Sequence, residues 1–205
     1  MMTLTRVHLA LFAACAATVA VLAAILIARV NEQSAAEQTT AAGFHGGLRP
    51  AGIPVFDFAL RDQDGHRVST RSLRGRPVIV TFIYAHCKDT CPITVQQIRG
   101  ALDDLGQEIP VIGVSVDPKG DTPAAARGFL LRQHMTGRME YLLGTRAQLK
   151  PVWRHFFVRE QLPNEEHTAS TVILDAKGRQ RVGYFTSQLT PEDLAADVRR
   201  LERSE

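Results

Sequence analysis

Two cysteines, Cys87 and Cys91, stand four residues apart in the segment T-F-I-Y-A-H-C-K-D-T-C-P. If this segment forms a helical turn, residues i and i+4 share one face, so both sulfur atoms can point at one object. Two thiolates that converge on one point suit a soft metal ion, and a dithiol at the start of a helix also suits thiol–disulfide exchange. The pair therefore predicts metal binding, redox chemistry or both.

The neighbours of the pair favour the thiolate form. A helix that starts here brings the partial positive charge of its N-terminus, and Lys88 adds a full charge, whereas Asp89 opposes both. No other cysteine follows residue 28, and a disulfide that closes so short a loop adds little stability. We therefore expect these cysteines to serve chemistry rather than folding.

Alternating strand and helix patterns surround the cysteines. Residues 77–84 are β-branched and almost continuously apolar, as in a strand buried on both faces, and a helix is expected over 92–105. A second buried strand is expected over 109–116. Thr122 and Pro123 then supply a cap and a first-turn proline for another helix.

The later half of the chain predicts a strand over 140–143, a helix over 145–157, two strands over 171–174 and 180–185, and a last helix from Thr190. A hairpin around Asp64 and Gly65 precedes the cysteine region. A β-α-β half followed by a β-β-α half is the layout of an α/β, thioredoxin-like fold, here with an extra N-terminal β-hairpin. The cysteines follow the first central strand, which is the usual active position of an open α/β sheet.

A third ligand is expected from His167, in the polar segment L-P-N-E-E-H-T-A-S-T-V-I-L before a predicted strand. A lone loop histidine is by default a surface residue, but in a thioredoxin-like sheet this loop lies beside the cysteine loop. Two sulfur atoms and one nitrogen suit three-coordinate copper better than structural zinc, which takes four ligands. The predicted metal ligands are Cys87, Cys91 and His167.

The N-terminus carries 20 uncharged, mostly apolar residues, 9–28, which is enough to cross a hydrocarbon core about 30 Å thick. Because the apolar part of a cleaved signal is shorter, we predict an uncleaved membrane anchor over 1–31, with cleavage as the alternative. Cys15 is interpreted as a plain membrane cysteine, with lipid attachment as the alternative. Residues 32–50 are predicted to be a flexible tether, and 51–205 the copper-binding domain. We expect a single-pass inner-membrane protein whose domain faces the periplasm.

The balance of charged residues argues against a nucleic-acid partner. The chain has 24 basic and 21 acidic residues, and without Arg6 and Arg29 the basic count falls to 22, which nearly balances the acidic residues. No stripe of lysine or arginine interleaved with aromatic residues is present, so nucleic-acid binding is not expected.

Three separated motifs resemble the Sco/SenC family of membrane-anchored copper chaperones. They are F-I-Y-A-H-C-K-D-T-C-P, D-P-K-G-D-T-P from Asp117, and E-H-T-A-S-T-V-I-L-D-A-K-G-R from Glu166, and the resemblance spans about residues 50–203. It implies a thioredoxin-like fold, a bound copper ion, and a role in assembling the binuclear copper (CuA) centre of cytochrome c oxidase. It also places Cys87, Cys91 and His167 at the family's copper ligands.

The chain departs from the family pattern at two positions, where Lys88 and Ile83 replace a frequent proline and glycine. Neither is a ligand, but Lys88 puts a positive charge beside the predicted metal site. His86 is expected to have a structural or supporting role, because neighbouring side chains diverge. Asp117 and Asp121 are expected to make a turn and cap a helix.

Two functions compete. The first is a copper-binding assembly factor, without enzymatic turnover, that passes copper to the copper-bearing subunit of cytochrome c oxidase or another cuproprotein. The second is a membrane-tethered thiol–disulfide oxidoreductase acting on cuproprotein cysteines, in which Cys87 and Cys91 are the redox-active pair and His167 is not needed. A peroxidase is a third possibility, but Y-A-H-C lacks the threonine and proline expected before a peroxidatic cysteine.

Overall fold

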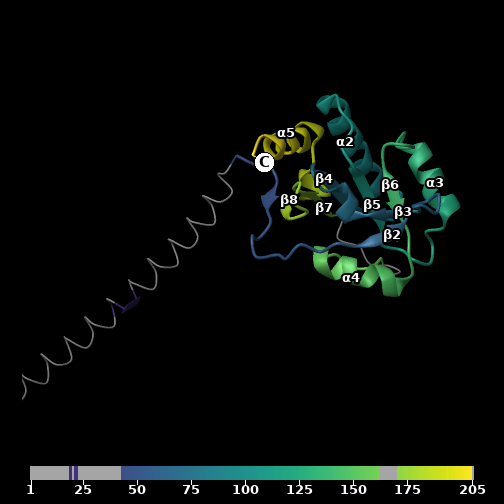
Figure 1. Ribbon diagram of the computed structural model, residues 1–205, viewed down its shortest axis with the longest axis horizontal. Helices are drawn as coiled ribbons and strands as arrows, with labels where there is room; N and C mark the ends of the chain where they lie inside the picture. Colours follow the sequence, from purple (N-terminus) through teal and green to yellow (C-terminus); the bar gives the residue numbers. More distant parts are fainter. Residues whose placement is uncertain (1–18, 20, 23–42, 162–169, 205) are drawn as a thin grey trace, which may run out of the picture. The chain divides into compact units, whose positions relative to one another are not determined.

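The computed structural model describes residues 19, 21–22, 43–161 and 170–204 of the 205-residue chain. The chain divides into two units, Met1–Gly43 and Phe44–Glu205, and all the strands in the described residues belong to the second (Figure 1).

Among the described residues, six strands form one mixed sheet in the order β1-β8-β7-β4-β5-β6. Strand β4 is central, because it pairs in parallel with β5 and antiparallel with β7. A separate two-stranded hairpin, β2 with β3, turns at the predicted position around Asp64 and Gly65. The bounds are β1 Gly47–Leu48, β2 Ala59–Arg61, β3 Arg67–Ser69, β4 Val78–Ile83, β5 Val111–Ser115, β6 Glu140–Leu142, β7 Ser170–Leu174 and β8 Gln180–Phe185.

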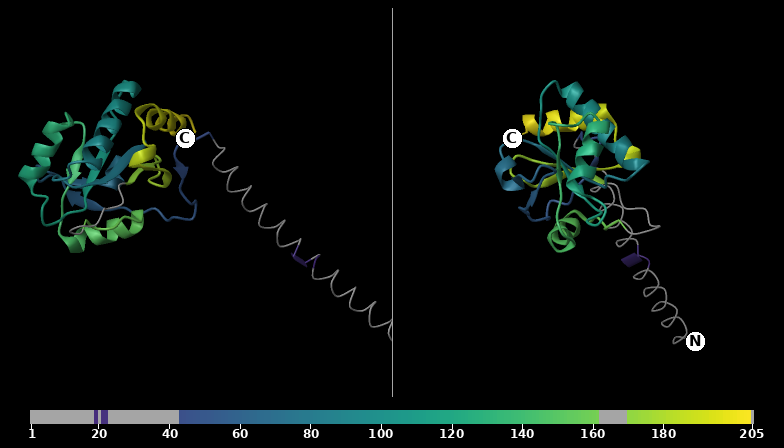
Figure 2. Two further views of the ribbon diagram at one scale, coloured as in Figure 1. Left: turned by 180° about the vertical axis from the view of Figure 1, so that it is seen from behind. Right: turned by 90° about the vertical axis from the view of Figure 1, so that its right-hand side faces the viewer.

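Helices cover both faces of this sheet. Helices α2 (Thr90–Leu105) and α5 (Pro191–Arg203) lie side by side over one face, and α4 (Arg146–Phe156) covers the other (Figures 1 and 2). Helix α3 (Pro123–Arg132) packs into the same core as α2 and α5. Short 3-10 turns, Thr70–Leu73 and Thr186–Gln188, follow β3 and β8.

The expected helix starts are confirmed by their caps. The hydroxyl groups of Thr122 and Thr190 accept hydrogen bonds from the third residue of the helix that follows, and a proline takes the first helical position in each.

Strand β4 is buried at every position, and its side chains alternate between two cores. Ile79 and Ile83 pack with α2, α3 and α5, whereas Val78, Val80 and Phe82 pack with α4 and the β2–β3 hairpin. The predicted strand with two buried faces is therefore confirmed. The packing on both sides fixes the direction in which the chain leaves β4 toward the cysteines.

The structure differs from the predicted tether at its C-terminal end. Residues 47–48 form β1 and pair with β8, so the last part of the range 32–50 belongs to the folded unit. Gly46 in this part of the chain has a structural purpose, because a Cβ on it would lie only 2.5 Å from Val182 Cγ1. A close backbone approach, rather than flexibility, requires glycine there.

The predicted membrane anchor lies outside the described residues, apart from positions 19, 21 and 22. Within the described part of the chain, no helix combines the length and the apolar character needed to cross a membrane.

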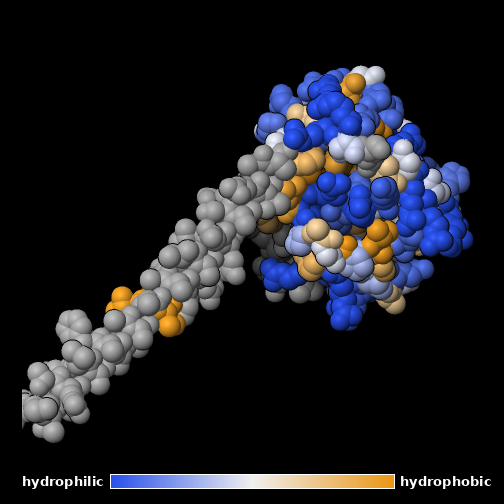
Figure 3. All heavy atoms as spheres, turned by 60° about the vertical axis from the view of Figure 1, so that its left-hand side comes forward, coloured by the Kyte–Doolittle hydropathy of each residue, from blue (hydrophilic) through white to orange (hydrophobic). Residues whose placement is uncertain are grey.

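The surface of the folded unit is mostly hydrophilic on the face shown in Figure 3, with small hydrophobic groups scattered over it. The apolar side chains of the sheet and helices are instead gathered in the two cores on either side of β4.

One buried carboxylate joins the last helix to the segment just before β1 and to β8. Asp197 on α5 is fully buried and accepts hydrogen bonds from the backbone N–H groups of His45 and Gly46, at 2.9 and 3.0 Å, and from the hydroxyl of Tyr184. Buried donors that lose their acceptor each cost about 1–3 kcal/mol. We predict that Asp197→Ala lowers the free energy of unfolding by about 2–4 kcal/mol in urea denaturation.

The control for this prediction is Glu202→Ala on the same helix, because Glu202 is exposed and its carboxylate accepts a hydrogen bond from the exposed Gln107 side chain. It should change the unfolding free energy by less than about 0.5 kcal/mol. Equal effects of the two substitutions would contradict the role assigned to Asp197.

Candidate metal centre

The cysteine loop connects the end of β4 at Ile83 to the start of α2 at Thr90. It opens with a turn in which the backbone N–H of Cys87 donates to the carbonyl oxygen of Tyr84 at 3.2 Å. Cys87 therefore precedes the helix, whereas Cys91 is its second residue. The helical turn that would place both cysteines on one face as i and i+4 residues is not formed, and α2 begins at Thr90, two residues before the expected start at 92.

The sulfur atoms nevertheless converge, because Cys87 acts as the cap of α2. The backbone N–H of Cys91 donates to Cys87 Sγ at 3.2 Å, and Thr90 Oγ1 lies 3.6 Å from the same sulfur. Asp89, the residue at the cap position, makes no side-chain cap bond. A sulfur atom therefore takes the place of the oxygen that usually satisfies a first-turn N–H.

The two thiols differ strongly in acidity. The hydrogen bond from the Cys91 thiol lowers the pKa of Cys87 to about 4, assisted by the Cys91 backbone N–H and opposed by burial. The same hydrogen bond, together with burial, raises the pKa of Cys91 far above its ordinary value. At neutral pH the pair therefore holds one thiolate and one thiol, and both cysteines are reduced and buried.

Tyr84 and Thr90 also lie beside the Cys87 sulfur, and neither was among the predicted site residues. Burial and a hydrogen bond to Cys87 raise the pKa of the Tyr84 phenol to about 12, so it remains a hydrogen-bond donor at neutral pH. The pattern Y-x-x-C-x-x-T contained the signal, because these residues flank the first cysteine at turn spacing. Their hydroxyl groups stabilise a negative sulfur.

The predicted ligand His167 lies outside the described residues. The structure does describe Ser170, where β7 begins, and Thr171 pairs with Thr81 of the antiparallel neighbour β4. The chain thus enters β7 at the same end of the sheet at which it leaves β4 toward the cysteines.

The two residues beside Cys87 have different surroundings. The ring Nε2 of His86 lies 3.2 Å from the carbonyl oxygen of Gly120, which agrees with the predicted structural role. The Lys88 side chain is exposed.

The two aspartates of the second motif play different parts. Asp117 makes the predicted turn, since its Oδ1 accepts from the backbone N–H of Gly120 at 2.9 Å. Asp121 does not cap a helix, because that role belongs to Thr122. Its carboxylate is buried and accepts from the backbone N–H of Ala85, the hydroxyl of Ser115 and the hydroxyl of Tyr141. The prediction for Asp121 was wrong because its hydrogen-bond partners come from distant parts of the chain, which local sequence patterns do not reveal.

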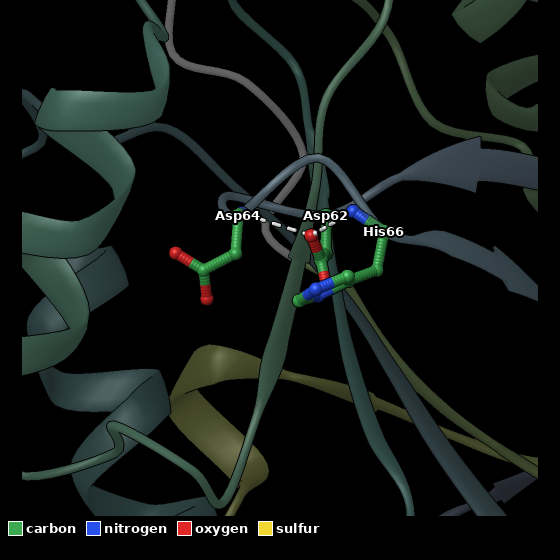
Figure 4. A group of neighbouring side chains, drawn as sticks. All are labelled: Asp62, Asp64 and His66. Carbon is green, nitrogen blue, oxygen red and sulfur yellow. Dashed lines mark hydrogen bonds and ion pairs between the residues drawn. The ribbon is translucent and has the colours of Figure 1, made fainter.

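A second group of possible ligands, Asp62, Asp64 and His66, lies in the β2–β3 turn. One ligand atom of each residue lies within 4.8 Å of the others, but Asp62 Oδ1 already accepts from the backbone N–H groups of Asp64 and His66, both at 2.8 Å (Figure 4). The Asp62 carboxylate is thus used in closing the hairpin, which is a common role of aspartate in turns.

Comparison with solved structures identifies the fold. The structure of Bradyrhizobium japonicum ScoI with copper bound is 32% identical, covers 72% of this chain and 98% of its own, and superposes with a TM-score of 0.63. BsSco, a member of the Sco family of cytochrome c oxidase assembly proteins, gives a TM-score of 0.66 at 23% identity over 77% of this chain and 98% of its own. The fold and the dithiol after β4 define a thioredoxin-like protein, as predicted.

Sequence comparison identifies the family. The SCO1/SenC family model matches residues 50–203. An SCO2-like protein of Rickettsia prowazekii is 30% identical over 141 residues, which make up 62% of this chain and 67% of the relative. The chain belongs to the SCO1/SenC family.

The asymmetry of the dithiol predicts an unusual pH dependence. Alkylation requires the thiolate, so the rate at a cysteine of ordinary pKa, about 8.5, rises on the order of a hundredfold between pH 6 and 8. With its pKa near 4, Cys87 is already ionised throughout this range. We expect its iodoacetamide reaction, followed by mass spectrometry of the peptide that carries it, to change less than about twofold between pH 6 and 8.

The matched control is Cys91→Ala, which removes the thiol donor but keeps the backbone N–H at position 91. The pKa of Cys87 should then rise, and its alkylation profile should shift to higher pH. A profile that is the same in both proteins would show that the Cys91 thiol does not acidify Cys87.

Proposed function

We propose that this protein binds one copper ion through Cys87, Cys91 and His167 and passes it to the CuA-bearing subunit of cytochrome c oxidase. The observation that carries the proposal is the convergence of the two cysteines, with Cys87 Sγ 3.2 Å from the backbone nitrogen of Cys91. Thiolate sulfur selects Cu(I), and the buried pair offers a preformed part of a low-coordinate site. Here copper is cargo, and the protein acts without enzymatic turnover.

The state of the pair suits reversible loading. The Cys87 thiolate is ready to bind, whereas Cys91 must release its proton when the metal enters. Because both cysteines must be reduced, copper loading and disulfide formation exclude each other. When Cys91 takes up its proton again, it no longer binds the ion, and a ligand of the acceptor can take its place. This step allows the ion to be released.

The third ligand is proposed from its place in the chain. His167 precedes β7, and β7 enters the sheet beside the end of β4 that leads to the dithiol. An imidazole nitrogen from this segment would complete a three-coordinate copper site.

Membership of the SCO1/SenC family supports copper as the cargo and the CuA-bearing subunit as the acceptor. The SCO1/SenC model covers the region that contains all three proposed ligands, and the relative at 32% identity, ScoI, has been solved with copper bound. We further propose that residues 1–31 anchor the protein in the inner membrane, with the domain in the periplasm. The uncharged run 9–28 supports the anchor, and a client embedded in the same membrane would then be within reach.

A second candidate function, thiol–disulfide exchange with the cysteines of a cuproprotein, is favoured by the acidity of Cys87. A thiolate available at neutral pH is the attacking form in such exchange. This function requires both cysteines but not His167, so one variant separates the two candidates.

The test is copper binding by the reduced full-length chain, titrated against a chelator of known copper affinity. We expect one equivalent of copper, lost in Cys87→Ser and in Cys91→Ser, and at least about tenfold weaker binding in His167→Ala because a ligand is removed. His134→Ala is the matched control, since His134 is exposed and lies after α3. It should leave the affinity unchanged.

Two results would redirect the assignment. Copper affinity that does not respond to His167→Ala would remove the third ligand. No copper binding at all, together with rapid reduction of a model disulfide by the wild-type chain, would favour the oxidoreductase.

A further inference from the structure

Asp121 is a buried carboxylate whose two oxygen atoms have separate partners. Oδ1 accepts from the backbone N–H of Ala85 at 2.7 Å. Oδ2 accepts from the hydroxyl groups of Ser115 at 2.6 Å and Tyr141 at 2.9 Å. One oxygen thus holds the cysteine loop, and the other is attached to β5 and β6 of the central sheet.

The bond to Ala85 belongs to a set of contacts on the first half of the cysteine loop. The carbonyl oxygen of Ala85 accepts from Arg132 Nη2 at 3.4 Å, and His86 Nε2 lies 3.2 Å from the carbonyl oxygen of Gly120. The partners all come from α3 and the segment that connects β5 to α3. The bond from Ala85 to Asp121 is the shortest of these contacts and is buried.

Ala85 and His86 are the residues through which the chain reaches Cys87. On its other side, the Cys87 sulfur is held by the N–H of Cys91 at the start of α2. The spacing of the two sulfur atoms therefore depends on two supports, α2 on one side and the Asp121 contact on the other. If the second support is lost, Cys87 can move while Cys91 stays in the helix.

We infer that Asp121 is a positioning residue for the dithiol: through the N–H of Ala85 it holds Cys87 at the distance from Cys91 that a shared metal ion requires. The inference deepens the proposed copper-binding function and depends on it for the affinity effect. Its structural part, the restraint of the loop, stands without metal. Asp121 touches neither cysteine in the described hydrogen bonds and acts only through the backbone.

The chain offers a matched comparison in Asp197. This carboxylate is also buried, and it too accepts from backbone N–H groups and from a tyrosine hydroxyl. Its partners lie at the start of the folded unit and on β8, away from the cysteine loop in the sequence and in the hydrogen-bond network. Loss of either carboxylate removes a similar set of hydrogen bonds. The bonds of Asp121 include one to the cysteine loop, whereas the bonds given above for Asp197 do not.

The experiment compares Asp121→Ala with Asp197→Ala in the full-length, reduced chain at a temperature where circular dichroism shows both folded. The first measurement is copper affinity against a competing chelator. The second is amide hydrogen exchange, without metal, of the peptide that spans residues 84–91. We expect Asp121→Ala to weaken copper binding at least about tenfold and to speed exchange of this peptide several-fold, with Asp197→Ala changing neither.

Two further variants keep the inference testable if Asp121→Ala does not fold. Asp121→Asn retains an oxygen for Ala85, and its amide group can donate to the Ser115 and Tyr141 hydroxyls, so it should restore most of the affinity and the protection. Tyr141→Phe removes a donor from Oδ2 and leaves the Ala85 bond intact. It should lower stability without altering copper binding.

The outcomes separate the restraint on the cysteine loop from the proposed copper binding. Normal affinity and normal exchange in folded Asp121→Ala would overturn the inference, and so would equal effects in Asp197→Ala or a loss of affinity in Tyr141→Phe. If the wild-type chain binds no copper, the proposed function fails. Faster exchange of residues 84–91 in Asp121→Ala alone would then still establish the restraint on the dithiol.

Discussion

The burial of β4 on both faces is the constraint on which the rest of this structure depends. A strand that is packed from two sides cannot shift its register, because each one-residue shift would exchange the side chains of the two cores. The loop after Ile83 therefore leaves the sheet at a fixed point and in a fixed direction. The helix α2 that follows is held in turn by its long contact with α5. The cysteines occupy the short connection between these two rigid elements.

Within that connection, the sulfur atom of Cys87 both caps the helix and supplies the thiolate. The start of α2 has N–H groups without helical partners, and a dithiol that binds metal needs a stabilised thiolate. Cys87 Sγ accepts the N–H of Cys91 and so caps the helix, and the same bond favours its negative charge. Because the Cys91 thiol also donates to it, the two cysteines share one proton and differ in acidity. Metal transfer and thiol exchange both need such a pair, which explains why geometry at the two sulfur atoms does not separate the candidate functions.

Much of this architecture could be predicted from local patterns. The continuous apolar run marked β4, the threonine–proline pairs marked the starts of α3 and α5, and Asp64 with Gly65 marked the hairpin. These signals depend only on residues that are close in the sequence, so they can be recognised without knowledge of the tertiary structure. The end of the tether could not be predicted in this way, because the small and polar residues of 32–50 do not reveal the pairing of β1 with β8 or the close approach of Gly46 to Val182. Asp121 was expected to cap a helix, and its actual role could not be predicted for the same reason, since its partners Ala85, Ser115 and Tyr141 come from three other parts of the chain.

The sequence by itself determined the chemistry of this protein: a dithiol between a buried strand and a helix, with a histidine placed before a later strand and an apolar run at the N-terminus. The tertiary structure alone decided how the dithiol works. It showed that Cys87 lies outside the helix and caps it, that Tyr84 and Thr90 lie beside its sulfur, and that Asp121 accepts a hydrogen bond from the cysteine loop at Ala85. The physical reason is that residue types set which bonds are possible, whereas acidity and position depend on distances and burial, which exist only once separated segments have packed together.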